Sequence, residues 1–126
     1  MNREEFIAAY TDVFTQAYTW AEKARREGLL ALEELISDDK YKNRDIFSYG
    51  MRFVVDGTDS EIINKILSNI ITQEEDHYRR VLKTIQKEAL LAIQEGWNPR
   101  LLVALMNSYT DMSLEEDEAY QALKNE

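Results

Sequence analysis

Residues 58–96 read TDSEIINKILSNIITQEEDHYRRVLKTIQKEALLAIQEG, and this stretch decides the fold. Its apolar residues recur at steps of three and four, which is the spacing of one face of an α-helix. They are Ile62, Ile63, Ile66, Leu67, Ile70, Ile71, Tyr78, Val81, Leu82, Ile85, Ala89 and Ile93. Because neither Gly nor Pro interrupts the run before Gly96, we predict one long helix over residues 58–96.

The N-terminal part of the chain carries the same helical spacing. Asn2 followed by Glu5 has the form of an N-cap with a reciprocal capping Glu, so a helix is expected to begin there. The apolar positions that follow are Phe6, Tyr10, Val13, Phe14, Ala17, Ala21, Ala24, Gly28, Leu32, Leu35 and Ile36. They predict a second long helix over residues 1–37, which would be roughly 50 Å long at about 1.5 Å per residue.

A short helix is expected between the two long ones, over residues 44–57. Its apolar residues are Ile46, Phe47, Gly50, Met51, Val54 and Val55. Gly57 fits the position just after a helix, where a positive φ is free of a Cβ clash.

The C-terminal part, residues 98–126, is expected to form one or two short helices. Asn98 is a suitable N-cap, and Pro99 suits the first position of a helix. Ser113 with Glu116 has the form of a further capping pair.

Together these patterns predict an all-α protein, a long-helix bundle with two long helices, a short connecting helix and one or two short C-terminal helices. A length of 126 residues fits a single domain. The net charge of −9 argues against nucleic acid as a partner, because phosphate binding depends on Lys and Arg. The chain has no Cys and no apolar run of the roughly 18 residues that span a bilayer. We therefore expect a soluble, cytoplasmic protein without membrane insertion.

Two helices of this length cannot bury the whole apolar stripe of residues 58–96 against each other in so small a protein. An exposed apolar stripe commonly mediates self-association, so we expect a homodimer.

Catalytic and metal-binding chemistry find little support in the sequence. Glu74 and His77 have the i, i+3 spacing of ligands in di-iron helical bundles, but such sites need a second motif and the chain has only one His. No nucleophile elbow and no Gly-rich phosphate loop occur. We expect no enzyme activity, no metal and no cofactor, and we interpret Glu74 as part of a solvated acidic face.

Three segments resemble one family in the order in which that family has them. Residues 24–33 read ARREGLLALE, residues 55–59 read VDGTD, and residues 88–102 read EALLAIQEGWNPRLL. The first two resemble the cytoplasmic loop of the MotA family, the membrane-embedded stator subunits of the bacterial flagellar motor. The third resembles the segment that follows the last membrane helix of those proteins. The two membrane helices that separate the loop from this segment in MotA are missing here.

The resemblance implies a contact site. In the MotA family an Arg three residues before the Gly of the first segment and a Glu five residues after it are implicated in contacts with the rotor protein FliG. Relative to Gly28, these positions are Arg25 and Glu33, and Arg26 could share the role of Arg25. On one continuous helix the two side chains would lie roughly 12 Å apart. The alternative is that they are ordinary solvated charges, with Arg25 or Arg26 pairing with Glu22 one turn away.

Trp97 lies within the third segment and has two interpretations. Packed against Leu102 or Met106 it would belong to the core, which is what we expect. An exposed Trp97 would instead indicate a contact surface.

The function expected from the resemblance is that of a non-catalytic interaction protein of the flagellar motor, which binds a rotor or stator component such as the C-terminal domain of FliG without conducting ions. One alternative is a structural homo-oligomer unrelated to torque, and another is a helical metal-dependent enzyme. A natural protein and an artificial deletion of the membrane hairpin would both give such a chain. The continuous helical pattern and the polar residues near the N-terminus favour a natural one.

Overall fold

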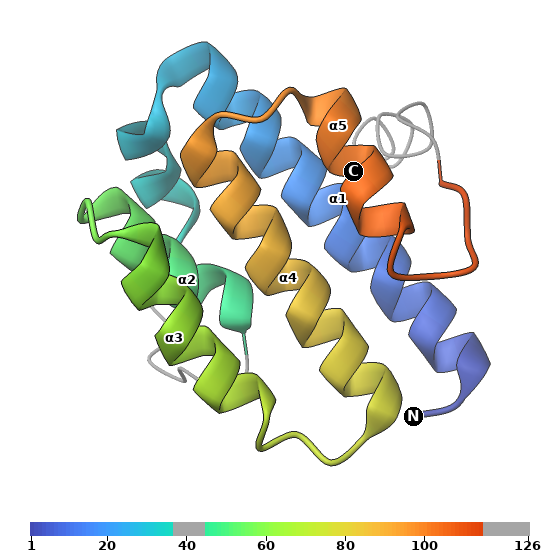
Figure 1. Ribbon diagram of the computed structural model, residues 1–126. Helices are drawn as coiled ribbons and strands as arrows, with labels where there is room; N and C mark the ends of the chain where they lie inside the picture. Colours follow the sequence, from blue (N-terminus) through green and yellow to red (C-terminus); the bar gives the residue numbers. More distant parts are fainter. Residues whose placement is uncertain (37–44, 115–126) are drawn as a thin grey trace.

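The computed structural model describes residues 1–36 and 45–114, and all the regular elements in these residues are helices (Figure 1). The predicted all-α fold is therefore confirmed. The helices are α1 (Arg3–Glu27), the 3₁₀ helix η1 (Leu29–Leu35), α2 (Ile46–Val55), α3 (Ser60–Ile71), α4 (His77–Glu95) and α5 (Pro99–Asn107). Among the described helices, none has the length and apolar character needed to cross a membrane.

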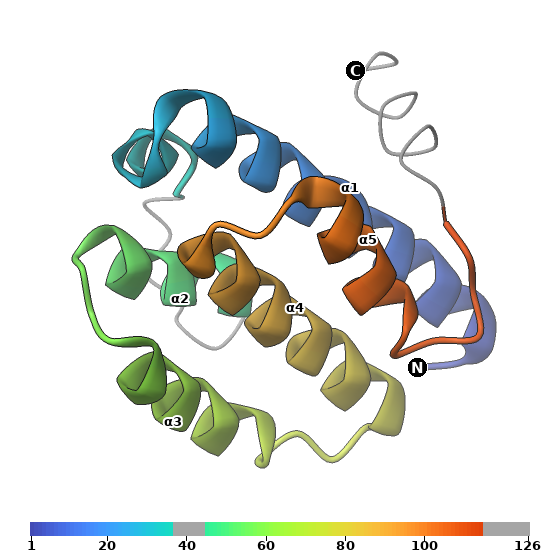
Figure 2. The same cartoon turned by 45° about the horizontal axis from the view of Figure 1, so that its top comes forward.

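Helix α4 lies in the middle of the structure and contacts α1, α2, α3 and α5 (Figures 1 and 2). Its buried residues are Leu82, Ile85, Ala89, Leu90, Ala92 and Ile93. Helices α1 and α4 run parallel, and near their first turns the ring of Phe6 stacks on that of Tyr78 with centroids 4.8 Å apart.

Helix α5 runs back along α1. The Tyr10 hydroxyl, in the first half of α1, donates a 2.7 Å hydrogen bond to Asn107 Oδ1 at the end of α5. Beyond α5, Asp111 accepts hydrogen bonds of 2.8 and 3.0 Å from the Arg3 guanidinium. The start of α5 consequently lies near the end of α1.

The prediction of one helix over residues 58–96 is wrong. Helix α3 ends at Ile71, residues 72–76 turn, and α4 begins at His77 and returns beside α3. Asp76 is the N-cap of α4, and its carboxylate accepts a 2.8 Å hydrogen bond from the Arg79 backbone N–H. A capping Asp stabilises the start of a new helix, and the turn before it contains neither Gly nor Pro.

The physical reason for the turn is burial of the apolar stripe. In the folded-back arrangement Ile63 and Leu67 of α3 are fully buried in the same core as Ile85 of α4. A straight helix would leave half of this stripe in water, at a cost of about 25 cal/mol for each Å² of apolar surface. The unburied stripe from which we predicted a homodimer is therefore largely buried within the chain.

The first long helix is also shorter than predicted. Helix α1 ends at Glu27 because Gly28 adopts a φ of 91°, and η1 follows in place of the helix predicted as far as residue 37. The capping box of Asn2 and Glu5 is present as predicted. The helix also buries Trp20, which the predicted apolar face did not include.

The shorter elements agree with the sequence more closely. Helix α2 lies within the predicted residues 44–57, and Gly57 follows it with a φ of 80°. Helix α5 begins at Pro99 after the Asn98 cap, as predicted. The second C-terminal helix predicted from Ser113 lies largely outside the described residues.

At Gly50, α2 lies close to side chains of both α3 and α4. A Cβ atom added at Gly50 would lie 2.6 Å from Leu90 Cδ2 and 2.9 Å from Leu67 Cδ1. Both Leu side chains are fully buried, so they have little room to move away. The absence of a side chain at Gly50 thus sets how closely α2 packs on the other two helices.

We predict that Gly50→Ala lowers the free energy of unfolding by up to about 2 kcal/mol, because an overpacked core costs about 1–3 kcal/mol and the gain in helix propensity offsets only about 1 kcal/mol of this cost. Urea denaturation measures the change. Ala8→Gly, at an exposed position of α1, gives the propensity contribution alone as a control. Shortening the clashing side chain with Leu90→Val should reduce the cost of Gly50→Ala. A Gly50→Ala variant more stable than the wild type would show that the contact is not tight.

Candidate partner-binding site

Arg25 and Arg26 lie together in the last turn of α1, and both side chains are exposed. Cations are favourable at this end of a helix because the backbone carbonyls there carry partial negative charge. Arg26 Nε donates a 3.3 Å hydrogen bond to the backbone carbonyl of Glu22, not to its carboxylate. Within the described residues, the Arg25 guanidinium forms no hydrogen bond or ion pair. The pairing with the Glu22 side chain, which was the alternative interpretation, is therefore not observed.

Lys23, one turn earlier, is engaged in ion pairs. Its Nζ lies 3.3 Å from a carboxylate oxygen of Glu27 and 3.3 Å from one of Glu34. These contacts raise the pKa of Lys23, with the hydrogen bond to Glu27 the larger cause. The pair with Glu34 also connects η1 to α1, whereas within the described residues neither Arg25 nor Arg26 forms an ion pair.

Glu33 is exposed on η1 and borders a hollow of about 210 Å³ with Ile36, Arg52, Val55 and Asp56. Arg25 does not border this hollow. The expectation that Arg25 and Glu33 project from one continuous helix is therefore wrong, because Gly28 ends α1 between them. The structure places Arg25 and Arg26 beside one hollow and Glu33 beside another.

Arg100 is a site residue that the sequence did not single out. It borders an open hollow together with Glu22, Arg25, Arg26, Asn98 and Pro99. The Asn98 side chain caps α5 by accepting a 2.8 Å hydrogen bond from the Arg100 backbone N–H. Arg100 lies 75 residues after Arg25 in the numbering, so only the packing of α5 against α1 shows that they share a surface.

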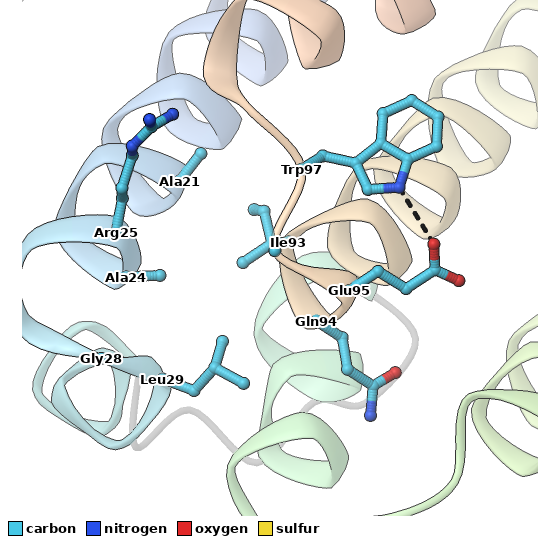
Figure 3. Close-up of a pocket in the computed structure, with 10 residues that line it drawn as sticks. Ala21, Ala24, Arg25, Gly28, Leu29, Ile93, Gln94, Glu95 and Trp97 are labelled. Atoms are coloured by element: carbon cyan, nitrogen blue, oxygen red, sulfur yellow. Dashed lines mark hydrogen bonds between the residues drawn. The ribbon is translucent and has the colours of Figure 1, made fainter.

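Trp97 is 39% exposed, so our expectation that it belongs to the core is wrong. Its indole Nε1 donates a 3.0 Å hydrogen bond to the Glu95 carboxylate (Figure 3). Trp97 and Arg25 both border a cleft of about 250 Å³ between the C-terminal ends of α1 and α4. An aromatic side chain and a basic side chain are thus exposed beside one cleft.

Glu74 and His77 make separate contacts in the structure. Glu74 Oε1 lies 3.0 Å from Lys83 Nζ, and Oε2 accepts a 3.1 Å hydrogen bond from the Asp76 backbone N–H. His77 is exposed beside Tyr78, with ring centroids 5.7 Å apart. Across residues 1–36 and 45–114, no three or more His, Asp or Glu side chains are grouped as metal ligands would be. Glu74 therefore stabilises the turn that precedes α4.

Comparison with known proteins gives three similar curated proteins, each named motility protein A. The chain is 38% identical to the protein of Treponema phagedenis over 81 residues. These residues make up 64% of this chain and 30% of the relative. It is 37% identical over 81 residues to that of Treponema pallidum, with the same coverage. It is 36% identical over 95 residues to that of Borreliella burgdorferi, covering 74% of this chain and 35% of the relative.

The chain thus spans about a third of the length of the curated relatives it matches. No protein-family profile matches the chain. No solved structure matches it either.

We predict that the stability of the fold decreases as the pH falls below about 5, in part through Glu74. The hydrogen bond from the Asp76 backbone and the contact with Lys83 hold the Glu74 pKa below its ordinary value. The unfolded chain therefore takes up a proton near the usual Glu pKa of about 4.3, before the folded chain does, and stability is lost as the pH falls through the folded pKa.

Urea midpoints measured between pH 7 and pH 3 test this prediction. Glu74→Gln should reduce the pH dependence, and Glu75→Gln, at an exposed neighbouring position, is the control. Equal pH dependence in the wild type and in Glu74→Gln would contradict the assignment.

Proposed function

We propose that the protein is a non-catalytic component of the flagellar motor that docks a rotor or stator protein by charge complementarity. The proposal is supported by the relationship in sequence to motility protein A over about two thirds of the length of this chain. The candidate partner is the C-terminal domain of FliG, which the resemblance to the MotA family implies. The residues we assign to the contact are Arg25, Arg26 and Glu33.

The observation that carries this proposal is the arrangement of the helix ends. The start of α1 lies near the start of α4, as the stacking of Phe6 on Tyr78 requires, and residues 72–76 bring the end of α3 to the same end of the structure (Figure 1). In the MotA family these are the three points at which the chain leaves or enters the membrane. The opposite end of the structure carries Arg25 and Arg26.

This topology supports docking by the end that faces away from the membrane in the family. Arg25 and Arg26 are both exposed there, in a protein with a net charge of −9. Oppositely charged surfaces accelerate encounter and select among partners, and the effect weakens with salt because the Debye length is only about 8 Å at physiological ionic strength.

The proposal includes docking but not ion conduction. Helices α3 and α4 are joined directly by residues 72–76, at the point where the MotA family has its membrane hairpin. Residues 72–76 are all among the described residues, and they form a turn that ends at Asp76, the N-cap of α4.

We predict that calorimetry detects binding to the C-terminal domain of FliG that weakens as the salt concentration rises. Arg25→Glu should weaken binding by at least tenfold and reduce the salt dependence, since a charge-assisted hydrogen bond is replaced by repulsion. Glu33→Lys is measured separately, because Glu33 and Arg25 border different hollows.

Lys65→Glu is the matched control, because Lys65 is exposed on α3 and its replacement changes the net charge by the same amount. Equal weakening by Arg25→Glu and Lys65→Glu would show that only the net charge matters. The absence of binding by the wild type at high concentration would reject FliG as the partner.

A second proposal is self-association as a homodimer or homo-oligomeric scaffold. It is supported by the outer face of α3, where Ile62 is 50% exposed and Ile66 and Ile70 are half-buried.

We predict that, if α3 forms such an interface, Ile66→Lys with Ile70→Lys converts the protein to a monomer, because the charges would be buried without partners. Light scattering measures the mass, and circular dichroism checks that the helices are retained. A dimer that survives both changes would exclude this face.

A further inference from the structure

We propose that the cleft between the C-terminal ends of α1 and α4 receives an apolar side chain from an acidic partner helix, while Arg25 binds a carboxylate one turn away on the same helix. This inference deepens the proposed docking function and rests on it. It adds an apolar contact to a site that the sequence describes only by its charges.

The size and lining of the cleft suit a side chain. Figure 3 shows Ala21, Ala24 and Leu29 on one side and Ile93 pointing toward them from the other. At about 250 Å³ the cleft is smaller than the roughly 300–1,000 Å³ typical of small-molecule sites. It has room for one apolar side chain of the size of Leu or Phe.

Two glycines leave the mouth of the cleft unfilled. Gly28 ends α1 and Gly96 ends α4, with φ angles of 91° and 82° that L side chains rarely adopt. A Cβ atom at either position would meet no atom within 4 Å, so the space beside each glycine is open. The backbone requirement for helix termination therefore keeps the apolar walls accessible.

The surroundings of the cleft favour an acidic partner. Arg25 also borders the hollow that carries Arg26 and Arg100, and among the described residues that line this hollow Glu22 is the one acid. Glu95, the acid on the other side, accepts the hydrogen bond from Trp97.

A helix that carries an acid and an apolar residue three or four positions apart would match both features. Residues at that spacing lie on one face of a helix. Trp97 adds an exposed aromatic contact of the kind enriched in binding hot spots.

The test fills the cleft without changing any charge. Ala24 is half-buried at the wall of the cleft, and Leu is a good helix former, so Ala24→Leu should fold and occupy the space. We expect the Kd for the C-terminal domain of FliG to rise at least tenfold, while its salt dependence stays that of the wild type. Ala8→Leu, an exposed position at the other end of α1, should bind as the wild type does. Thermal unfolding checks that both variants are folded.

A readout without any variant makes the test independent of folding. In spectra of the ¹⁵N-labelled wild type, the amide signals of Gly28 and Gly96 should shift on addition of the FliG domain, and that of the buried Gly50 should not.

The outcomes separate the two proposals. Binding that is lost in Arg25→Glu but unchanged in Ala24→Leu, with no shift at Gly28 or Gly96, would overturn the apolar contact and leave the charge-based docking in place. No binding by the wild type would overturn both.

Discussion

The burial of α4 against four other helices is the constraint on which the rest of the structure depends. Its apolar face, which includes the fully buried Ile85 and Leu90, is wide enough that a single partner helix could not cover it. The turn at residues 72–76 brings α3 to one side, and Gly50 allows α2 to approach Leu90 closely. Since α1 runs parallel to α4 on the other side, the ends of these two helices lie side by side, and this juxtaposition creates the candidate site.

Much of the helical content could be predicted because its signals are local. The Asn2 cap and the Asn98-Pro99 pair each mark a helix start through hydrogen bonds or φ restrictions that span a few residues. The break after Ile71 was missed because the apolar spacing continues through it and no Gly or Pro marks it. Asp76, which follows two other acids, was the available signal for a new helix start, but the choice between a turn and a continuous helix depends on tertiary burial.

The candidate site could be predicted only in part. The exposure of Arg25 and Arg26 could be predicted because neither residue belongs to the set of apolar positions that form the buried face of α1. Their separation from Glu33 could have been inferred from Gly28, which we instead included in a continuous helix. Arg100 and the exposed Trp97 become part of the site through the packing of α5 and the end of α4 against α1, which no local pattern specifies.

The turn at residues 72–76 has a consequence for how the length of such chains can vary. Because the end of α3 and the start of α4 are already held close together by the core, a longer segment between them would add mainly loop-closure entropy, about 0.6 kcal/mol for each doubling of its length. The same helices could therefore pack identically around a short turn or around a large insertion at this point. A gain or loss of chain at this point would change the length of the protein, while the core that positions the opposite ends of α1 and α4 would stay the same.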